Sequence, residues 1–271
     1  MEPDREERVL LALHVLGVIS ATTVALGRVR GVVVVGLVGF TAASWMYLRV
    51  VATRMGDMSS VLSMPMTAAW TLVQAALMVV MWAVMMAAMM LPSAVPMVFA
   101  YDRMERGSPN DVRGSTPLFV AGYIIVWAAF AVVATALQWS LHAMTLVNGM
   151  GVVTQAWFSG GLLIGAGIIQ FTPSKARSLA ACRTPIGFLT ASWREGSTGA
   201  LAMGLHHGRL CLGCCWSLMI LLFVLGVMNL AWVAVLAVFV LLEKVARRGE
   251  TISRFGGLFL MAWGIAVFVG G

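Results

Sequence analysis

The chain is built from apolar runs separated by short polar segments. Most runs are close to the roughly 20 residues that an α-helix needs to cross a bilayer. The candidate spans that this pattern predicts are residues 9–26, 31–48, 67–91, 117–139, 151–170, 198–226, 228–245 and 252–269. Only residues 27–30 separate the first two, so in one alternative one of them lies on the membrane surface. We therefore expect an all-α, polytopic transmembrane helix bundle of about seven or eight spans.

The same pattern divides the chain into two parts. Residues 1–66 are expected to hold one or two N-terminal spans and an outer loop containing methionines. Residues 67–271 are expected to form a metal-binding transmembrane helix bundle.

The composition agrees with a membrane protein. Hydrophobic residues make up 61% of the chain and charged residues 11%, whereas a soluble domain carries about 25% charged residues. The net charge of +7 lies in short loops between apolar runs and forms no continuous basic stripe. Lipid is therefore an expected partner, and nucleic acid is not.

The basic loops predict an orientation. Lysine and arginine concentrate in three alternate loops, at Arg103, Arg106 and Arg113, at Lys175, Arg177, Arg183 and Arg194, and at Lys244, Arg247, Arg248 and Arg254. Positively charged loops of membrane proteins face the cytoplasm. We therefore expect these loops inside and the C-terminus on the outer side, and we interpret Glu243 and Lys244 as a pair at the membrane interface.

Residues 203–216 bring together an unusual set of soft donors, with three of the four cysteines and two of the four histidines. At 100° per residue, His207, Met203 and the three cysteines share one helical face, and His206 points away. Thiolate, thioether and imidazole groups together favour Cu(I) or zinc. The candidate metal ligands from this segment are Cys211, Cys214, Cys215, His207, His206 and Met203.

One helix cannot supply every ligand of a single ion. His207 and Cys214 are separated by roughly 10 Å of helical rise, and metal–ligand bonds are about 2.0–2.3 Å long. Methionines of the span 67–91 are the expected partners, and thioether suits Cu(I) better than zinc. The expected ligands there are Met81, Met85 and Met89, and the expected relay residues are Met86, Met90 and the loop residue Cys182.

Other interpretations of these residues remain open. Methionine commonly fills apolar cores, and Cys211 with Cys214 has the spacing of a redox pair, typical of a membrane thiol–disulfide oxidoreductase. Glycines in spans 151–170 and 198–226 favour close helix packing inside the bundle, and they also fit a scaffold subunit of a membrane complex. Pro92 and Pro96 are expected to end or kink their helix.

The sequence contains none of the motifs of an ATP-driven pump or of common hydrolases. Neither a GxxxxGK[ST] loop nor an HExxH or GxSxG motif is present. The combination of donors favours a metal-binding protein over an enzyme.

Four blocks of sequence resemble a bacterial family of predicted metal-binding integral membrane proteins. They are residues 81–92, residues 170–175 with 182–185, the block Cys211-Leu-Gly-Cys214-Cys215-Trp216 with its preceding residues, and residues 228–232 followed by 243–244. The resemblance implies a multi-pass protein of the bacterial inner membrane. It also implies a copper metallochaperone-like role with a copper-dependent enzyme or copper-carrying protein as partner.

One position departs from the family pattern. Ser178 stands where the family has a second cysteine, four residues before Cys182. We expect Cu(I) as the bound metal, with zinc as the alternative. Whether identical chains associate is left open by the sequence.

Overall fold

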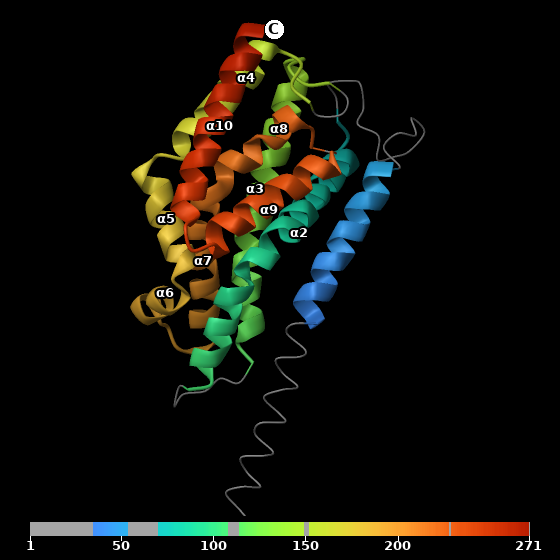
Figure 1. Ribbon diagram of the computed structural model, residues 1–271. Helices are drawn as coiled ribbons and strands as arrows, with labels where there is room; N and C mark the ends of the chain where they lie inside the picture. The colour runs from blue at the N-terminus through green and yellow to red at the C-terminus, as the bar shows by residue number, and fades with distance from the viewer. Residues whose placement is uncertain (1–34, 54–69, 108–113, 149–151, 228, 271) are drawn as a thin grey trace, which may run out of the picture.

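The computed structural model describes residues 35–53, 70–107, 114–148, 152–227 and 229–270 (Figure 1). These residues are almost entirely helical and contain no strand, which confirms the predicted all-α class. The helices are Val35–Thr53, α2 (Leu72–Glu105), α3 (Thr116–Ala143), α4 (Ala156–Ile169), α5 (Pro173–Arg183), α6 (Pro185–Ser192), α7 (Gly196–Ile220), α8 (Leu222–Leu225), α9 (Leu230–Val245) and α10 (Gly249–Gly270).

Five helical segments in the described ranges are long and apolar enough to cross a membrane. They are Val35–Thr53, Leu72–Glu105, Thr116–Ala143, Gly196–Leu225 and Gly249–Gly270. The expected span 9–26 lies outside the described residues. The expected span 228–245 corresponds to α9, which has only 16 residues and crosses the bundle obliquely in Figure 1. The count of seven or eight spans stays a prediction.

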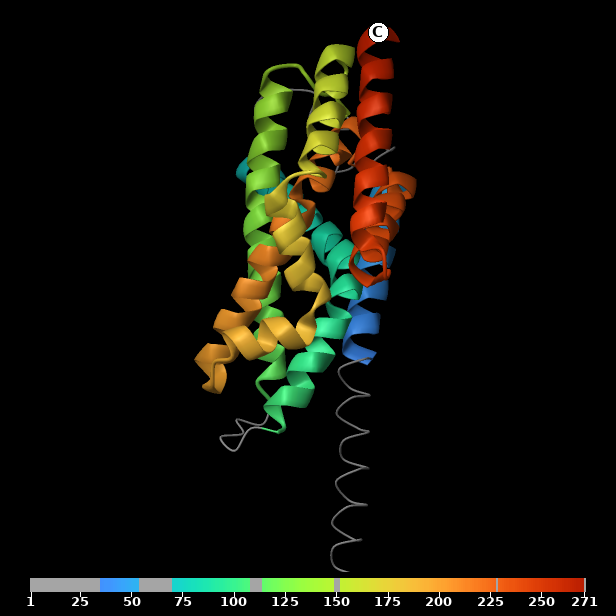
Figure 2. The same cartoon turned by 60° about the vertical axis from the view of Figure 1, so that its left-hand side comes forward.

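Helix α7 lies in the middle of the bundle and packs against α3, α4, α5 and α9 (Figure 2). Glycine makes the closest of these contacts, because a Cβ atom on Gly122 of α3 or Gly204 of α7 would collide with the backbone of the other helix. In the same way, Gly160 of α4 meets Gly264 of α10. Small residues allow such approaches in lipid, where close packing drives helix association.

Helix α2 is longer than its apolar run predicts. It begins at a capping box formed by Thr71 and Gln74 and continues to Glu105. Of the two expected effects of Pro92 and Pro96, an end or a kink, the structure excludes an end, because both lie inside the helix. Proline is tolerated within such helices where neighbouring helices and Ser side chains satisfy freed backbone groups.

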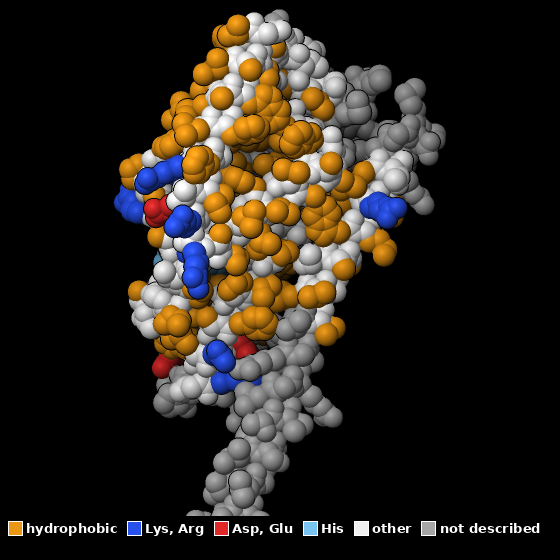
Figure 3. Space-filling model, viewed as in Figure 1, with side chains coloured by type: hydrophobic (Ala, Val, Ile, Leu, Met, Phe, Trp, Pro, Cys, Tyr) orange, Lys and Arg blue, Asp and Glu red, His pale blue; other side chains and the backbone are white. Residues whose placement is uncertain are grey.

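The surface of the bundle is largely apolar. In Figure 3 hydrophobic side chains cover most of the visible face, and lysine and arginine gather near its middle and lower end. Large apolar side chains such as Leu72, Phe255 and Val269 are more than two thirds exposed, at 87%, 69% and 80%. Soluble monomers rarely expose contiguous apolar patches of this kind, so the surface is compatible with a surrounding membrane.

The contact between α3 and α7 yields a test. Gly204→Leu should lower the free energy of unfolding by at least about 1–3 kcal/mol, because the new side chain meets the Phe119 backbone. Gly161→Leu is the matched control, since a Cβ atom there meets nothing within 4 Å. Thermal unfolding in detergent would measure both variants, and equal midpoints would contradict the packing described.

Candidate metal centre

All four cysteines of the chain gather at one place inside the bundle. Cys211, Cys214 and Cys215 lie in α7 and are no more than 1% exposed. Cys182 is partly exposed and belongs to the last turn of α5, where it forms a side-chain hydrogen bond with Cys214. The hydrogen bond and burial hold the pKa of Cys182 well above its usual range. Cys182 lies in the expected connection between α4 and α7, but the connection is helical at this residue.

The α7 cysteines face different neighbouring helices. The thiols of Cys214 and Cys215 each donate a hydrogen bond to the Cys211 carbonyl oxygen, at 3.0 Å. The Sγ atom of Cys211 lies 3.1 Å from the hydroxyl of Tyr123 in α3. Cys214 instead meets Cys182 of α5. The cluster therefore extends across α7 from α3 to α5.

Met90 of α2 contributes a fifth sulfur to this cluster. Its Sδ atom lies 3.9 Å from Cys215 Sγ. Two sulfurs bound to a trigonal ion at about 2.3 Å each would lie about 4 Å apart, so this pair is already at a suitable separation. The other expected methionines of α2 are buried in the core along the same helix; they are Met81, Met85, Met86 and Met89.

His207 lies one helical turn before Cys211 but within an aromatic environment. Its ring stacks on the rings of Phe119 and Tyr123, whose centroids lie 6.0 and 5.5 Å from its own. The ring of Phe188 lies 5.6 Å away on another side. The Nδ1 atom of His207 is buried without a hydrogen-bond partner.

The remaining donors predicted in α7 lie farther from the cysteines. His206 is exposed and packs edge-on against Phe188, so the structure does not bring it to the sulfur cluster. Met203 is buried, two helical turns before Cys211.

Three polar side chains beside the sulfurs were not among the predicted site residues. Lys244 of α9 donates hydrogen bonds to Cys211 Sγ and to Ser93 Oγ, both at 2.9 Å. Tyr123 donates to the Met90 carbonyl oxygen at 3.2 Å while its hydroxyl also contacts Cys211. The sequence could have pointed to this part of the site through Lys244, because an ionisable residue at the end of an apolar helix is usually functional.

Glu243 and Lys244 are adjacent in sequence but serve different parts of the structure. Glu243 forms an ion pair with Lys175 of α5, at 2.9 and 3.1 Å, and both side chains are 1% exposed. Lys175 also bonds to Gln170, which accepts a further hydrogen bond from Ser253. Glu243 and Lys244 are therefore both buried and bond to separate partners, and their expected position at the membrane interface stays a prediction.

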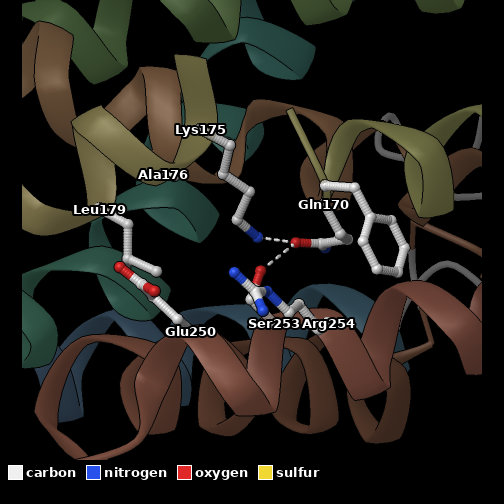
Figure 4. A pocket seen from close by; sticks show the side chains of 8 residues that line it. Gln170, Lys175, Ala176, Leu179, Glu250, Ser253 and Arg254 are labelled. Atoms are coloured by element: carbon white, nitrogen blue, oxygen red, sulfur yellow. Dashed lines mark hydrogen bonds between the residues drawn. The ribbon is translucent and has the colours of Figure 1, made fainter. Parts of the chain in front are cut away.

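A small cavity lies beside this ion pair (Figure 4). It has a volume of about 50 Å³, and Gln170, Lys175, Glu250, Ser253 and Arg254 contribute to its lining. Figure 4 shows the Gln170 and Lys175 side chains pointing toward each other, with Ser253 of α10 bonding to Gln170. None of the cysteines lines it, so the cavity is separate from the sulfur cluster.

The donors gathered here are mostly sulfur atoms. Within the described ranges, no group of three His, Cys, Asp or Glu side chains is placed to hold a metal ion. A structural zinc site would need four such ligands. Thiolate with thioether is a combination that selects Cu(I).

The comparison with known families gives one match. A family model described as the copper chaperone PpoB2 matches residues 79–267. The chain belongs to the PpoB2 copper chaperone family. The matched range contains every cysteine together with Met90 and Lys244. No curated protein and no solved structure matches the chain.

The buried ion pair of Glu243 and Lys175 provides a stability test. Glu243→Gln should lower the free energy of unfolding by about 3–5 kcal/mol, because it leaves Lys175 charged and unpaired in the interior. The double variant Glu243→Gln with Lys175→Met should recover most of the loss. Denaturation in detergent would measure both, and an equal loss in the two variants would contradict this account.

Proposed function

We propose that this protein is an integral membrane copper chaperone that binds Cu(I) as cargo and delivers it to a copper-dependent enzyme. The observation that carries the proposal is the clustering of three buried cysteines of α7 with Met90 and with the partly exposed Cys182. Family membership names copper, and the five long apolar helices of the described ranges support a membrane location.

The contacts favour Cys211, Cys215 and Met90 as the Cu(I) ligands. Cys211 and Cys215 are four residues apart and therefore lie on one face of α7. Met90 is already in contact with Cys215. Two thiolates and one thioether complete a three-coordinate sulfur site, which no harder metal prefers.

Cys214 and Cys182 are suited to exchange of the ion with another protein. Cys214 neighbours the proposed ligands on α7, and its thiol contacts Cys182. Cys182 is the partly exposed member of the cluster. Beside it, Arg183 donates to the carbonyl oxygens of Ala246 and Arg247, within the basic segment expected at the cytoplasmic side. We infer that copper enters or leaves through Cys182.

The metal content of the purified protein tests the proposal. Protein loaded under reducing conditions in detergent should hold Cu(I), and the variant with Cys211, Cys214 and Cys215 all changed to Ser should hold none. Equal copper in the two proteins would refute the site.

Two separate methionine substitutions test whether Met90 is a thioether ligand. Met90→Leu should weaken Cu(I) binding by about tenfold, because a neutral sulfur donor is lost. Met78→Leu is the matched control, since Met78 is equally buried in α2 but lies three turns away. Competition with a chromogenic Cu(I) chelator would measure both affinities, and a similar effect of the two changes would assign Met90 to packing alone.

Copper binding should also depend on pH in a defined direction. Thiols bind metals as thiolates, so binding releases protons and affinity falls as the pH falls. Each thiol that is protonated in the metal-free protein contributes up to about tenfold per pH unit. Chelator competition across pH 6–8 should therefore show weaker binding at the acid end, whereas a flat profile would argue against thiolate ligation.

The contact between Cys182 and Cys214 also favours a second candidate, a membrane thiol–disulfide oxidoreductase. A disulfide between these residues would join α5 to α7 by oxidation of two thiols, with a partner disulfide or quinone accepting the two electrons. Alkylation of thiols in intact cells followed by mass spectrometry distinguishes the candidates. A substantial oxidised fraction supports redox exchange, and permanently reduced thiols support copper transfer.

A further inference from the structure

The buried charges of the bundle are compensated in different ways. Glu243 and Lys175 neutralise each other. Arg183 reaches the backbone at a partly exposed position. Among the buried charged side chains that the structure describes, Lys244 is the cation that bonds to no carboxylate, and its side-chain partners are the sulfur of Cys211 and the hydroxyl of Ser93.

We propose that Lys244 determines the charge specificity of the metal site, so that the site accepts a monovalent ion and rejects divalent ones. The inference rests on the proposed function and extends it to the choice between Cu(I) and divalent ions such as zinc. It assigns to Lys244 a role in specificity without direct contact with the metal.

The charge balance of the site carries the argument. Cu(I) with the thiolates of Cys211 and Cys215 has a net charge of −1, and the Lys244 ammonium brings the buried group to zero. Zinc with the same two thiolates is neutral, so Lys244 leaves an uncompensated positive charge. An unpaired charge in the interior is strongly unfavourable.

To restore neutrality, a divalent ion would need a third thiolate or the loss of the Lys244 proton, and the loss of that proton costs free energy. A third thiolate would restore neutrality, but no three His, Cys, Asp or Glu side chains in the described part of the chain are arranged around one ion. Met90 is neutral and adds a donor without adding charge. The ligand set therefore satisfies Cu(I) in both charge and coordination number.

Lys244 is held in place independently of the cysteine. Its Nζ atom bonds to Ser93 of α2 at 2.9 Å as well as to Cys211. It also lies in the last turn of α9, where the helix dipole favours a cation. The ammonium group can therefore remain beside the site when Cys211 turns its sulfur to a metal.

Metal competition with a neutral and a charged substitution tests this role. The full-length protein in detergent would be titrated with Cu(I) and with Zn(II) against chelators of known affinity. Lys244→Met should reduce the preference for Cu(I) over Zn(II) by more than about tenfold, because it removes one unit charge at contact distance. Lys244→Arg keeps the charge and should retain most of the preference.

The control is another basic residue near the cluster. Arg183→Met removes a partly exposed charge that water screens, and it should leave the preference within about threefold of wild type. Elution as a monodisperse species and unchanged helical circular dichroism would show that each variant folds. If Lys244→Met does not fold, Ser93→Ala, which removes the second anchor of the ammonium group, should shift the preference in the same direction by about threefold.

The outcomes separate this inference from the proposed function. An unchanged preference in Lys244→Met, or in Ser93→Ala where that variant is used, overturns the specificity role while copper binding stands. An equal loss of preference in Lys244→Met and Arg183→Met would overturn it as well, because it would reflect general electrostatics. A wild-type protein that binds no Cu(I) would refute both proposals.

Discussion

The burial of Glu243 and Lys244 in α9 constrains the arrangement of the surrounding helices. A buried charge costs several kcal/mol unless it is paired and hydrogen-bonded. Glu243 meets this requirement through Lys175 of α5, and Lys244 meets it through Cys211 of α7 and Ser93 of α2. One turn of α9 therefore ties three other helices together, and the sulfur cluster lies where they meet.

The helical character of the fold could be predicted because apolar runs report directly on length and burial. The ends of the apolar runs did not predict the ends of the helices, because packing and hydrogen bonding decide where a helix stops. Helix α2 passes through two prolines to Glu105, and the polar stretch after α4 folds into α5 and α6. These short helices have little apolar periodicity, and it is their packing against neighbouring helices that stabilises them.

The candidate site, too, could be predicted from the sequence only in part. Helical spacing predicts that the α7 cysteines share one face, because that relation depends on one helix alone. Contacts between helices depend on tertiary packing, which spacing does not encode. The contact of Met90 with Cys215 and the contact of Cys182 in α5 with Cys214 therefore became known only from the structure. The same holds for the contact of Lys244 in α9 with Cys211 and for the exposure of His206.

The packing of α5 on α7 has a consequence for variation within the family. A Cβ atom on Gly213 would lie 2.9 Å from the hydroxyl oxygen of Ser178, so position 178 faces the α7 segment between Cys211 and Cys214. Position 178 also lies one helical turn before Cys182. A relative with cysteine at this position would gain a further thiol at the edge of the cluster without moving a helix. A single substitution at position 178 would therefore change the number of sulfur donors near the cluster.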